Sequence, residues 1–450
     1  GRVGDEHQPA AGSEIIRKLD NGIKTCMYAG YPDLYMQFSK KNEFKFCPDW
    51  YRGVEYPKEQ ERGYASNEDL YVPGYFEMGI KKGETIVFSA ATSEIKTSSL
   101  KKLFDTEVDE RSPRDNFFHC LVNAAHQFHR REKNDDRYIL AGYPWFKCRA
   151  RDTFISLPGL TLSIEENDYF ELVMKTAMRG YYEFMEGIAE IEQPDVPLWA
   201  VWALQQYAKE TSKEECHKKY GQFIKDVIRF IQDNKHPNLE LKENGLLYTN
   251  GRDKAVTWMN STANGRPVVP RTGYIVEFNA LWYNALCFCA SLAGAVGEEA
   301  DQQKLLAQAE ITKKSFVDTF LNEYGYLYDY VDGNMMDWSV RPNMIFPVAF
   351  DYSPLSQDQK KKVLDICTRE LLTPKGLRSL SPKSGGYNPI YVGPQTQRDY
   401  AYHQGTAWPW LCGFYMEASL KLYKRTRLSF VERQMVGFED EMSYHCLGTI

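Results

Sequence analysis

The sequence predicts a mainly helical domain, built from two concentric rings of helices and preceded by part of an antiparallel β-sandwich domain. After Arg114, apolar residues recur at spacings of three and four, which is the period of a helix. Helices with one apolar face alternate with helices that are apolar nearly all round, as expected for an outer and an inner ring. We place the partial sandwich and a linker at 1–105 and the helical ring at 106–450.

The segments before Thr92 have the composition of strands. Residues 33–39, 43–50 and 84–92 alternate or are rich in β-formers, and Gly, Pro and Asn lie between them. These strands are too few to close two sheets, so we expect the chain to begin inside the sandwich domain. Residues 93–112 are charged, and we expect them to form a linker.

The helical part contains about eleven periodic segments. They are 116–131, 152–164, 168–187, 197–211, 218–234, 277–296, 300–321, 342–350, 356–372, 407–424 and 430–446. A ring of six helical hairpins needs twelve helices, so we expect the chain to lack its last helix. A helical repeat array is the main non-enzymatic alternative, although no strong sequence repeat is present.

Bulk composition narrows the class of protein. The net charge of −6 and the pI near 5.9 argue against a nucleic-acid partner. The sequence has no run of about 18 apolar residues, so we expect no membrane span. Its 10 cysteines lack metal-type spacing, and we expect mostly free thiols in a reducing, cytoplasmic location and no metal.

Long loops rich in Gly, Pro and aromatic residues precede the apolar helices. They are 141–151, 188–197, 250–276, 326–342 and 373–405. In a ring of helices such loops gather at one end, where a binding site is expected.

The stretch 141–162 is the first candidate for that site. Tyr143 and Trp145 offer rings that can stack on a pyranose, and Arg151 and Asp152 can hydrogen-bond to neighbouring hydroxyls. Asp152 also suits a helix start, because a carboxylate can accept hydrogen bonds from free N–H groups there. The alternative is a capped helix with a local ion pair and no ligand.

Three further loop-to-helix junctions carry Trp with Arg and a carboxylate or amide. The residues are Trp258, Asn260, Arg271 and Glu277; Asp337, Arg341 and Asn343; and Arg398, Asp399, His403, Gln404, Trp408 and Trp410. Helix capping is the alternative role for Glu277, and structural hydrogen bonding is the alternative for His403. Recurrence at four junctions favours a shared site.

These junctions resemble the amylo-α-1,6-glucosidase part of glycogen debranching enzymes. The resemblance rests on the ordered series GYPWF…RDTFISLPGL, TWMNS with GRPVVPRTG, EFNALWYNAL, SVRPNMIFPVAFDYSPLS, ELLTPKGLRSLSP and YHQGTAWPW. Upstream, WYRGVEYPKEQERGYASNEDLYVPG resembles the close of that family's N-terminal β-sandwich domain. The resemblance implies an (α/α)6 barrel related to glucoamylases, and it implies no metal or organic cofactor.

The implied activity is inverting hydrolysis of the single α-1,6-linked glucose left at a trimmed branch of glycogen or another branched α-glucan. Arg151 and Asp152 match the pair that grips the non-reducing glucose. The full predicted substrate-binding set is Tyr143, Trp145, Arg151, Asp152, Asp195, Trp258, Arg271, Asp337, Arg341, Asn343, His403, Gln404 and Trp408.

The sequence departs from the family at the catalytic acid. The family has an Asp directly after Thr-Trp-Met, where this chain has Asn260, and an amide has no proton to give at neutral pH. Either Glu277 or another carboxyl substitutes, or the chain is a weakened or inactive glucan-binding homologue. The catalytic base is expected after Ile450. A helical scaffold for protein partners is a third reading, which the polar segments 218–234 and 356–372 disfavour.

Overall fold

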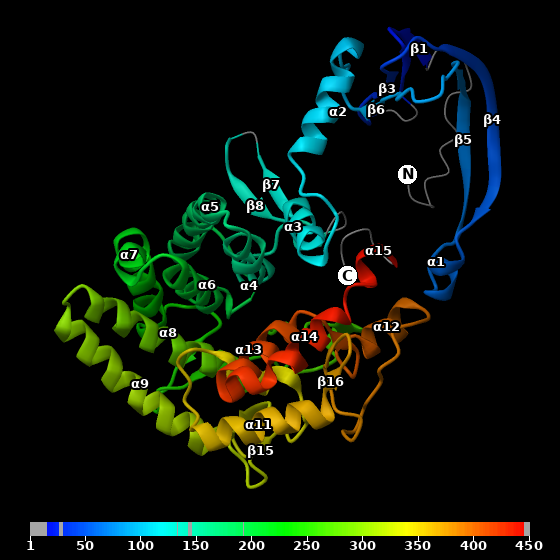
Figure 1. Ribbon diagram of the computed structural model, residues 1–450. Helices are drawn as coiled ribbons and strands as arrows, with labels where there is room; N and C mark the ends of the chain where they lie inside the picture. The colour runs from blue at the N-terminus through cyan, green and yellow to red at the C-terminus, as the bar shows by residue number, and fades with distance from the viewer. Residues whose placement is uncertain (1–15, 27–29, 133, 143–145, 192, 445–450) are drawn as a thin grey trace. The chain divides into compact units, whose positions relative to one another are not determined.

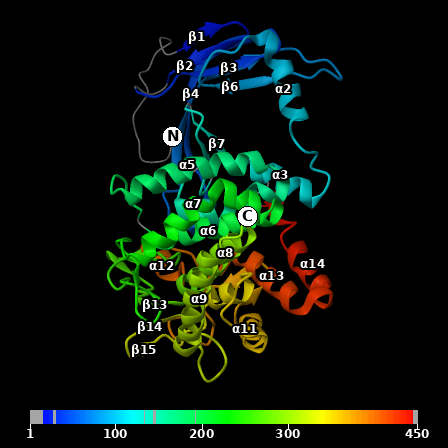
Figure 2. The same cartoon turned by 90° about the vertical axis from the view of Figure 1, so that its left-hand side faces the viewer.

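The computed structural model describes residues 16–26, 30–132, 134–142, 146–191 and 193–444 (Figures 1 and 2). The chain divides into two compact units, residues 1–113 with 392–395, and residues 114–391 with 396–450. No helix among the described residues combines the length and the apolar composition that a membrane crossing requires. The described cysteines are free thiols, as predicted.

The first unit is built from antiparallel sheets. Its elements are β1 (Ile16–Leu19), β2 (Gly22–Thr25), β3 (Leu34–Phe38), β4 (Glu43–Glu55), α1 (Pro57–Glu61), β5 (Asn67–Glu77), β6 (Phe88–Ala91) and α2 (Leu100–Asp109). One sheet has the order β1-β2-β3-β6, and β4 pairs with β5 in a long hairpin. The rings of Phe38 and Phe76 join the two sheets, with centroids 4.9 Å apart.

A helix, α2, occupies half of the segment 93–112, where the sequence predicts a linker without a helix of its own. Leu100, Leu103, Phe104 and Val108 recur at spacings of three and four, which the charges around them obscured. Strand β5 was not predicted either, although it completes the hairpin with β4.

The second unit is mainly helical. Its helices are α3 (Phe117–Gln127), α4 (Ala150–Leu160), α5 (Asn167–Met185), α6 (Val196–Glu210), α7 (Lys213–Gln232), α8 (Val276–Ala295), α9 (Glu299–Phe320), α10 (Phe346–Ala349), α11 (Gln357–Glu370), α12 (Gln395–Ala401), α13 (Leu411–Tyr423), α14 (Leu428–Val436) and α15 (Glu441–Tyr444). Short 3-10 turns lie at 97–99 in the first unit and at 162–164, 342–345 and 424–427 in the second.

The helices of this unit alternate between an inner and an outer position, as predicted. Helices α4, α6, α8, α10 and α13 are largely buried and pack against one another in chain order. Helices α5, α7, α9 and α11 each expose a polar face and bury the opposite one, whereas α14 buries Val431 alone. The core therefore lies between the two rings, where Trp199, Tyr207, Phe223, Phe278 and Trp282 are almost fully buried.

Short strands lie in the segments between the helices of this unit. They are β7 (His129–Arg131), β8 (Arg137–Ile139), β9 (Glu240–Leu241), β10 (Leu247–Thr249), β11 (Thr262–Ala263), β12 (Arg266–Pro267), β13 (Gly273–Ile275), β14 (Tyr330–Asp332), β15 (Met335–Met336), β16 (Leu372–Thr373), β17 (Gly376–Arg378) and β18 (Ala407–Trp408). The order β15-β14-β13-β10-β9 brings residues near 271 and 329 together, and β17 pairs with β18.

Candidate active site

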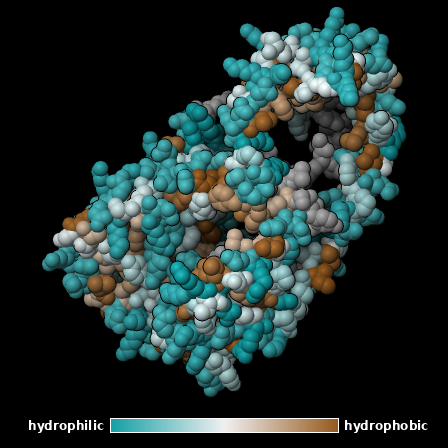
Figure 3. All heavy atoms as spheres, viewed as in Figure 1, coloured by the Kyte–Doolittle hydropathy of each residue, from teal (hydrophilic) through white to brown (hydrophobic). Residues whose placement is uncertain are grey.

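A pocket of about 330 Å³ lies in the second unit, where the start of α4 meets two loops that are distant in sequence. Its lining residues are Phe128, Leu140, Ala141, Arg149, Arg151, Asp152, Ile155, Ser156, Leu160, Gln193, Trp258, Asn260, Trp408 and Trp410. Figure 3 shows a mostly hydrophilic surface on this unit, with hydrophobic side chains where its face is hollowed. The fold thus gathers residues from three of the four junctions around one pocket.

Asp152 is the one acidic side chain among the described residues that line this pocket. Helix α4 begins at Ala150, two residues earlier than predicted, so Asp152 lies in the first turn and does not cap the helix. Its carboxylate accepts no hydrogen bond from the described residues. Burial raises the pKa of Asp152, while the nearby Arg151 and Arg149 guanidinium groups oppose the rise. The carboxylate is therefore free to accept hydrogen bonds from a ligand.

Arg151 pairs with Asp195 and not with its neighbour Asp152. Its Nε lies 3.0 Å from both carboxylate oxygens of Asp195, and its Nη2 lies 2.7 Å from Oδ1 and 2.9 Å from the Val256 carbonyl. Both side chains are at least 95% buried. Trp199 Nε1 also donates to Asp195. This two-pronged ion pair ties α4 to the start of α6 and to the loop at 256, and it leaves Asp195 outside the pocket lining.

Three indole rings form one wall of the pocket. Trp258 meets Trp408 and Trp410 edge to face, with ring centroids 5.3 and 5.2 Å apart. Trp408 is fixed by hydrogen bonds from its Nε1 to Thr406 Oγ1 and the Tyr402 carbonyl. Such rings offer flat apolar faces beside a carboxylate, which is the combination that a pyranose ring requires.

Asn260 lines the pocket two residues after Trp258, and its side chain is exposed. Its amide has no hydrogen-bond partner among the described residues. It can accept and donate hydrogen bonds, but it cannot supply a proton at neutral pH.

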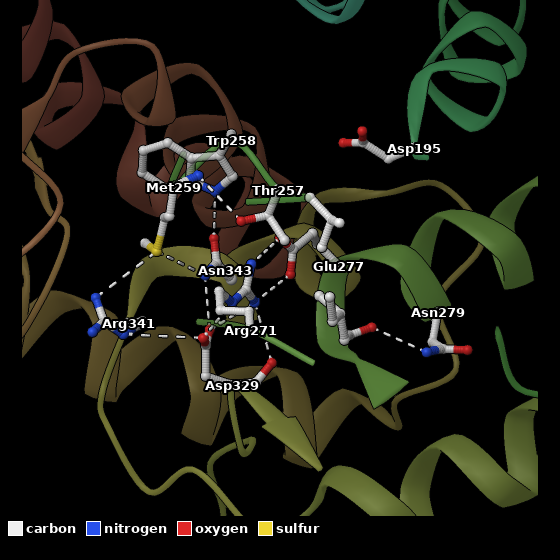
Figure 4. Close-up of polar contacts among 12 residues, drawn as sticks. Asp195, Thr257, Trp258, Met259, Arg271, Glu277, Asn279, Asp329, Arg341 and Asn343 are labelled. Carbon is white, nitrogen blue, oxygen red and sulfur yellow. Dashed lines mark hydrogen bonds and ion pairs between the residues drawn. The ribbon is translucent and has the colours of Figure 1, made fainter. Parts of the chain in front are cut away.

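A buried ionic network lies beneath Trp258 (Figure 4). Arg271 donates to both carboxylate oxygens of Glu277 and, at 2.6 and 3.0 Å, to both of Asp329. All three side chains are at least 98% buried. Burial raises the pKa of Glu277, and the ion pair with Arg271 opposes the rise. Antiparallel pairing of β13 with β14 brings these residues together.

Glu277 does not line the pocket, and both its oxygens are engaged by Arg271. The alternative in which Glu277 replaces the missing acid therefore has no geometric support. Arg271 is also held away from the pocket lining, so neither residue of this pair contacts a ligand there. We assign both to the support of the loop that carries Trp258.

Arg341 joins the same network from the segment before α10. Its guanidinium donates to the carbonyls of Ser379 and His403 at 3.1 and 2.9 Å and to Gln404 Oε1 at 2.8 Å. Its Nε lies 4.0 Å from Asp329 Oδ2. Arg341 and Gln404 thus tie the loop that leads to Trp408 to the base of the pocket, and neither lines it.

Residues 122–450, most of the chain, match the family described as Amylo-alpha-1,6-glucosidase. The chain belongs to the amylo-α-1,6-glucosidase family. Residues 3–87 match the family described as Glycogen debranching enzyme N terminal.

One relative of this amylo-α-1,6-glucosidase family chain and one solved structure with a similar fold are informative. The glycogen debranching enzyme of Saccharomyces cerevisiae is 25% identical over an alignment of 249 residues, and the match covers 42% of this chain and 16% of the yeast enzyme. A bacterial glucoamylase crystallised with acarbose aligns with a TM-score of 0.54 at 13% identity, covering 94% of this chain and 66% of the glucoamylase. At that identity the likeness shows the fold, a helical toroid preceded by antiparallel sheets.

The remaining predicted residues of this amylo-α-1,6-glucosidase family chain lie elsewhere. Tyr143 and Trp145 fall outside the described residues. Asp337 follows β15, and its Oδ1 accepts a hydrogen bond from the Ser339 N–H at 2.9 Å. Asn343 is completely buried beneath Trp258. The predicted substrate contacts of Asp337 and Asn343 are thus not supported by this geometry.

Sequence reasoning missed Asp329, Arg149 and Gln193. Asp329 lies between Tyr328 and Tyr330 in a β-prone run, and a carboxylate in such a run was the available signal. Arg149 and Gln193 line the pocket, but they are single polar residues in irregular loops, and no pattern distinguished them.

The buried His403 is expected to make the stability of this protein depend on pH. Its ring is fully buried and stacks on Trp408, with centroids 5.1 Å apart, and burial lowers the pKa of His403 to about 3. Unfolding restores a pKa near 6.5, so the unfolded state binds one more proton between these values. Stability therefore falls as the pH drops through this range, by up to about 1.4 kcal/mol per pH unit from this residue.

The variant His403→Phe keeps a ring against Trp408 and removes the titration. Urea unfolding is measured at several pH values between 6 and 4. The free energy of unfolding of this variant is expected to depend less steeply on pH, by the equivalent of about one proton. His236→Phe is the comparison, because burial also lowers the pKa of His236, to about 4. An unchanged slope in His403→Phe would show that its imidazole titrates normally.

Proposed function

We propose that this pocket binds the terminal glucosyl unit of a branched α-glucan, and that the chain is the glucosidase part of a debranching-type glycoside hydrolase. The observation that carries the proposal is Asp152, whose carboxylate has no hydrogen-bond partner among the described residues and lies in a pocket walled by Trp258, Trp408 and Trp410. Family membership and the names of the yeast debranching enzyme and the acarbose-bound glucoamylase support the same class of ligand.

The chemistry of the pocket suits one hexose. A volume of about 330 Å³ lies at the lower end of the range for small-molecule sites, roughly 300–1,000 Å³. The Asp152 carboxylate accepts hydrogen bonds from adjacent hydroxyls, and hydrogen bonds to a charged group are the strong kind. The indoles cover the apolar face of the ring, and Arg149 and Asn260 add donors at the edge.

Inverting hydrolysis uses two carboxyl groups about 6.5–9.5 Å apart, one acting as acid and the other as base. Among the described residues that line the pocket, Asp152 is the one carboxylate, and Asn260 is at the position that the family gives to the acid. This observation favours a second candidate function, binding of the same glucan with weakened or absent hydrolysis. Glycogen is the natural ligand in both proposals.

Glucose release distinguishes the two proposals. A chain extended by the segment that is expected to carry the catalytic base is incubated, with and without Asn260→Asp, with a phosphorylase-limit dextrin, and acarbose binding is measured by calorimetry for both. A positioned acid contributes about 10²–10⁴-fold to the rate, so Asn260→Asp is expected to release glucose at least about 100-fold faster while acarbose affinity changes little.

Each outcome decides between the candidates. Release by the unmodified chain rules out the non-hydrolysing candidate. Binding of acarbose without release by either variant favours that candidate. Failure of both variants to bind acarbose contradicts the assignment of this pocket to a glucosyl unit.

A further inference from the structure

Asn343 is the link between the Trp258 indole and the buried ionic network. It lies in the 3-10 turn Pro342–Ile345 and is completely buried. Trp258 Nε1 donates to its Oδ1 at 2.7 Å, and its Nδ2 donates to Asp329 Oδ1, also at 2.7 Å. Its Nδ2 further contacts Met259 Sδ at 3.7 Å. Figure 4 shows Asn343 between Trp258 and Asp329.

An amide is the side chain that this position requires. The indole Nε1 can only donate a hydrogen bond, and the Asp329 carboxylate can only accept one. A bridge between them must accept at one end and donate at the other. Asp at position 343 would place a second carboxylate against Asp329, and an aliphatic residue would leave the indole donor without its partner.

The far end of this bridge is fixed. Arg271 donates to both oxygens of Asp329 and is itself held by Glu277, so the Asp329 carboxylate cannot rotate freely. Arg271 therefore fixes the Asp329 carboxylate, Asp329 orients the Asn343 amide, and Asn343 orients the Trp258 indole. Because Asn343 also contacts Met259, it restrains the two residues before Asn260, and Asn260 itself lines the pocket.

We propose that Asn343 is a positioning residue of the pocket, which orients the Trp258 indole and the 258–260 segment without contacting the ligand itself. The proposal rests on the proposed function, in that the pocket takes a glucosyl unit. It replaces the substrate contact that the sequence predicted for Asn343. Asn343 is absent from the pocket lining, whereas Trp258 and Asn260 are part of it.

The first test is a double-mutant cycle with acarbose as the probe. Asn343→Leu and Trp258→Phe each remove the same hydrogen bond, and each is expected to weaken acarbose binding by about 3- to 10-fold. Because Asn343 acts through the indole, the two losses of acarbose affinity should not multiply. The affinity of the double variant is expected to lie within about 2-fold of that of the single variant with the lower affinity. Full multiplication of the two effects would overturn the proposal, since Asn343 would then act independently of Trp258.

The second test needs no ligand. In a deuterated chain labelled with ¹⁵N-tryptophan, the indole N–H signal of Trp258 is identified by its loss in Trp258→Phe. Asn343→Leu is expected to move this signal upfield and to speed its hydrogen exchange. An unmoved signal would overturn the positioning role, even if the chain bound no acarbose. Failure of the proposed function alone would leave the shift intact, so the two failures are distinguishable.

A polarity swap provides the rescue. Asn343→Asp combined with Asp329→Asn keeps the total charge: position 343 still accepts from Trp258, and position 329 donates to it and still accepts from Arg271 Nε, while the bond from Arg271 Nη2 is lost. The swap is expected to restore the indole signal and most of the affinity, whereas Asn343→Asp alone does not. A swap no better than Asn343→Asp alone would contradict the proposed bridge.

The matched control is Asn284→Leu. Asn284 is equally buried, and its amide bonds Gln205 Oε1 and the Tyr352 N–H, outside the network. Its loss is expected to lower stability while leaving acarbose affinity and the Trp258 signal unchanged. A comparable loss of affinity in this control would show that Asn343→Leu acts through general destabilisation, and would overturn the proposal.

Discussion

Replacing Arg271 with methionine is expected to lower the free energy of unfolding by about 3–5 kcal/mol, the usual result of removing one partner from a buried ion pair. Arg271 is 1% exposed, and its guanidinium is shared between Glu277 and Asp329. Methionine fills much of the same volume, so the loss arises mainly from two buried carboxylates left without their cation. Urea unfolding at pH 7 measures the difference.

The matched control for this prediction is Arg252→Met. Arg252 also pairs with a carboxylate, Asp332, at 2.9 Å, but 68% of its side chain is exposed. Its loss is expected to cost less than about 1 kcal/mol. If Arg271→Met lowered the free energy of unfolding no more than Arg252→Met does, the buried network would not stabilise the fold beneath the pocket.

A neutralising combination separates charge from packing. Adding Glu277→Gln and Asp329→Asn to Arg271→Met removes the stranded charges, so part of the lost stability is expected to return. The deficit of Arg271→Met itself is expected to shrink as the pH falls, because burial raises the pKa of Glu277 and its carboxylate can then take up a proton. A deficit that stays constant with pH would contradict the electrostatic origin.

The variant Asp152→Asn is expected to weaken acarbose binding by roughly 30- to 150-fold, which corresponds to about 2–3 kcal/mol for hydrogen bonds to a charged group. The amide has the same shape but lacks the charge and one acceptor. Calorimetric titration of both proteins measures the change. Asp168→Asn is the control, because Asp168 also lies in the first turn of a helix, α5, but outside this pocket. Its affinity for acarbose should match that of the unmodified chain.

The same substitution should not destabilise the fold. Burial raises the pKa of Asp152 in the folded state, so folding favours its protonated form. At pH 7, above its unfolded pKa, the ionised carboxylate therefore works against folding, and Asp152→Asn is expected to leave stability unchanged or raise it. A buried carboxylate that lowers the stability of the fold indicates a role in binding and not in folding. A marked loss of stability in Asp152→Asn would instead indicate a structural role.

The arrangement of helices was largely predictable from the sequence, because periodicity of three and four reports burial directly. The inner helix α8 reads as apolar all round, and the outer helix α7 reads as amphipathic. Charge concealed the periodicity of α2. Helix α4 began earlier than expected because Ala150 and Arg151 are good helix formers, whereas the prediction relied on the capping preference of Asp152.

The site was harder to predict, because a sequence shows which residues are present but not which of them pair. Arg151 and Asp152 are adjacent and of opposite charge, yet successive side chains on a helix point in different directions, and Asp195, 44 positions away, takes the guanidinium. Asp329 had no motif of its own, and its role depends on strand pairing between β13 and β14. The loop-to-helix junctions could be recognised in the sequence, whereas the contacts between the junctions could be seen only in the folded structure.

The central claim is that one glucosyl unit is held between Asp152 and the three indoles. A crystal structure of the chain with acarbose tests it most directly. We predict ligand density in this pocket, with a sugar hydroxyl within hydrogen-bonding distance of the Asp152 carboxylate and a ring face against Trp258, Trp408 or Trp410. Density at another place on the chain, with this pocket left empty, would contradict the account.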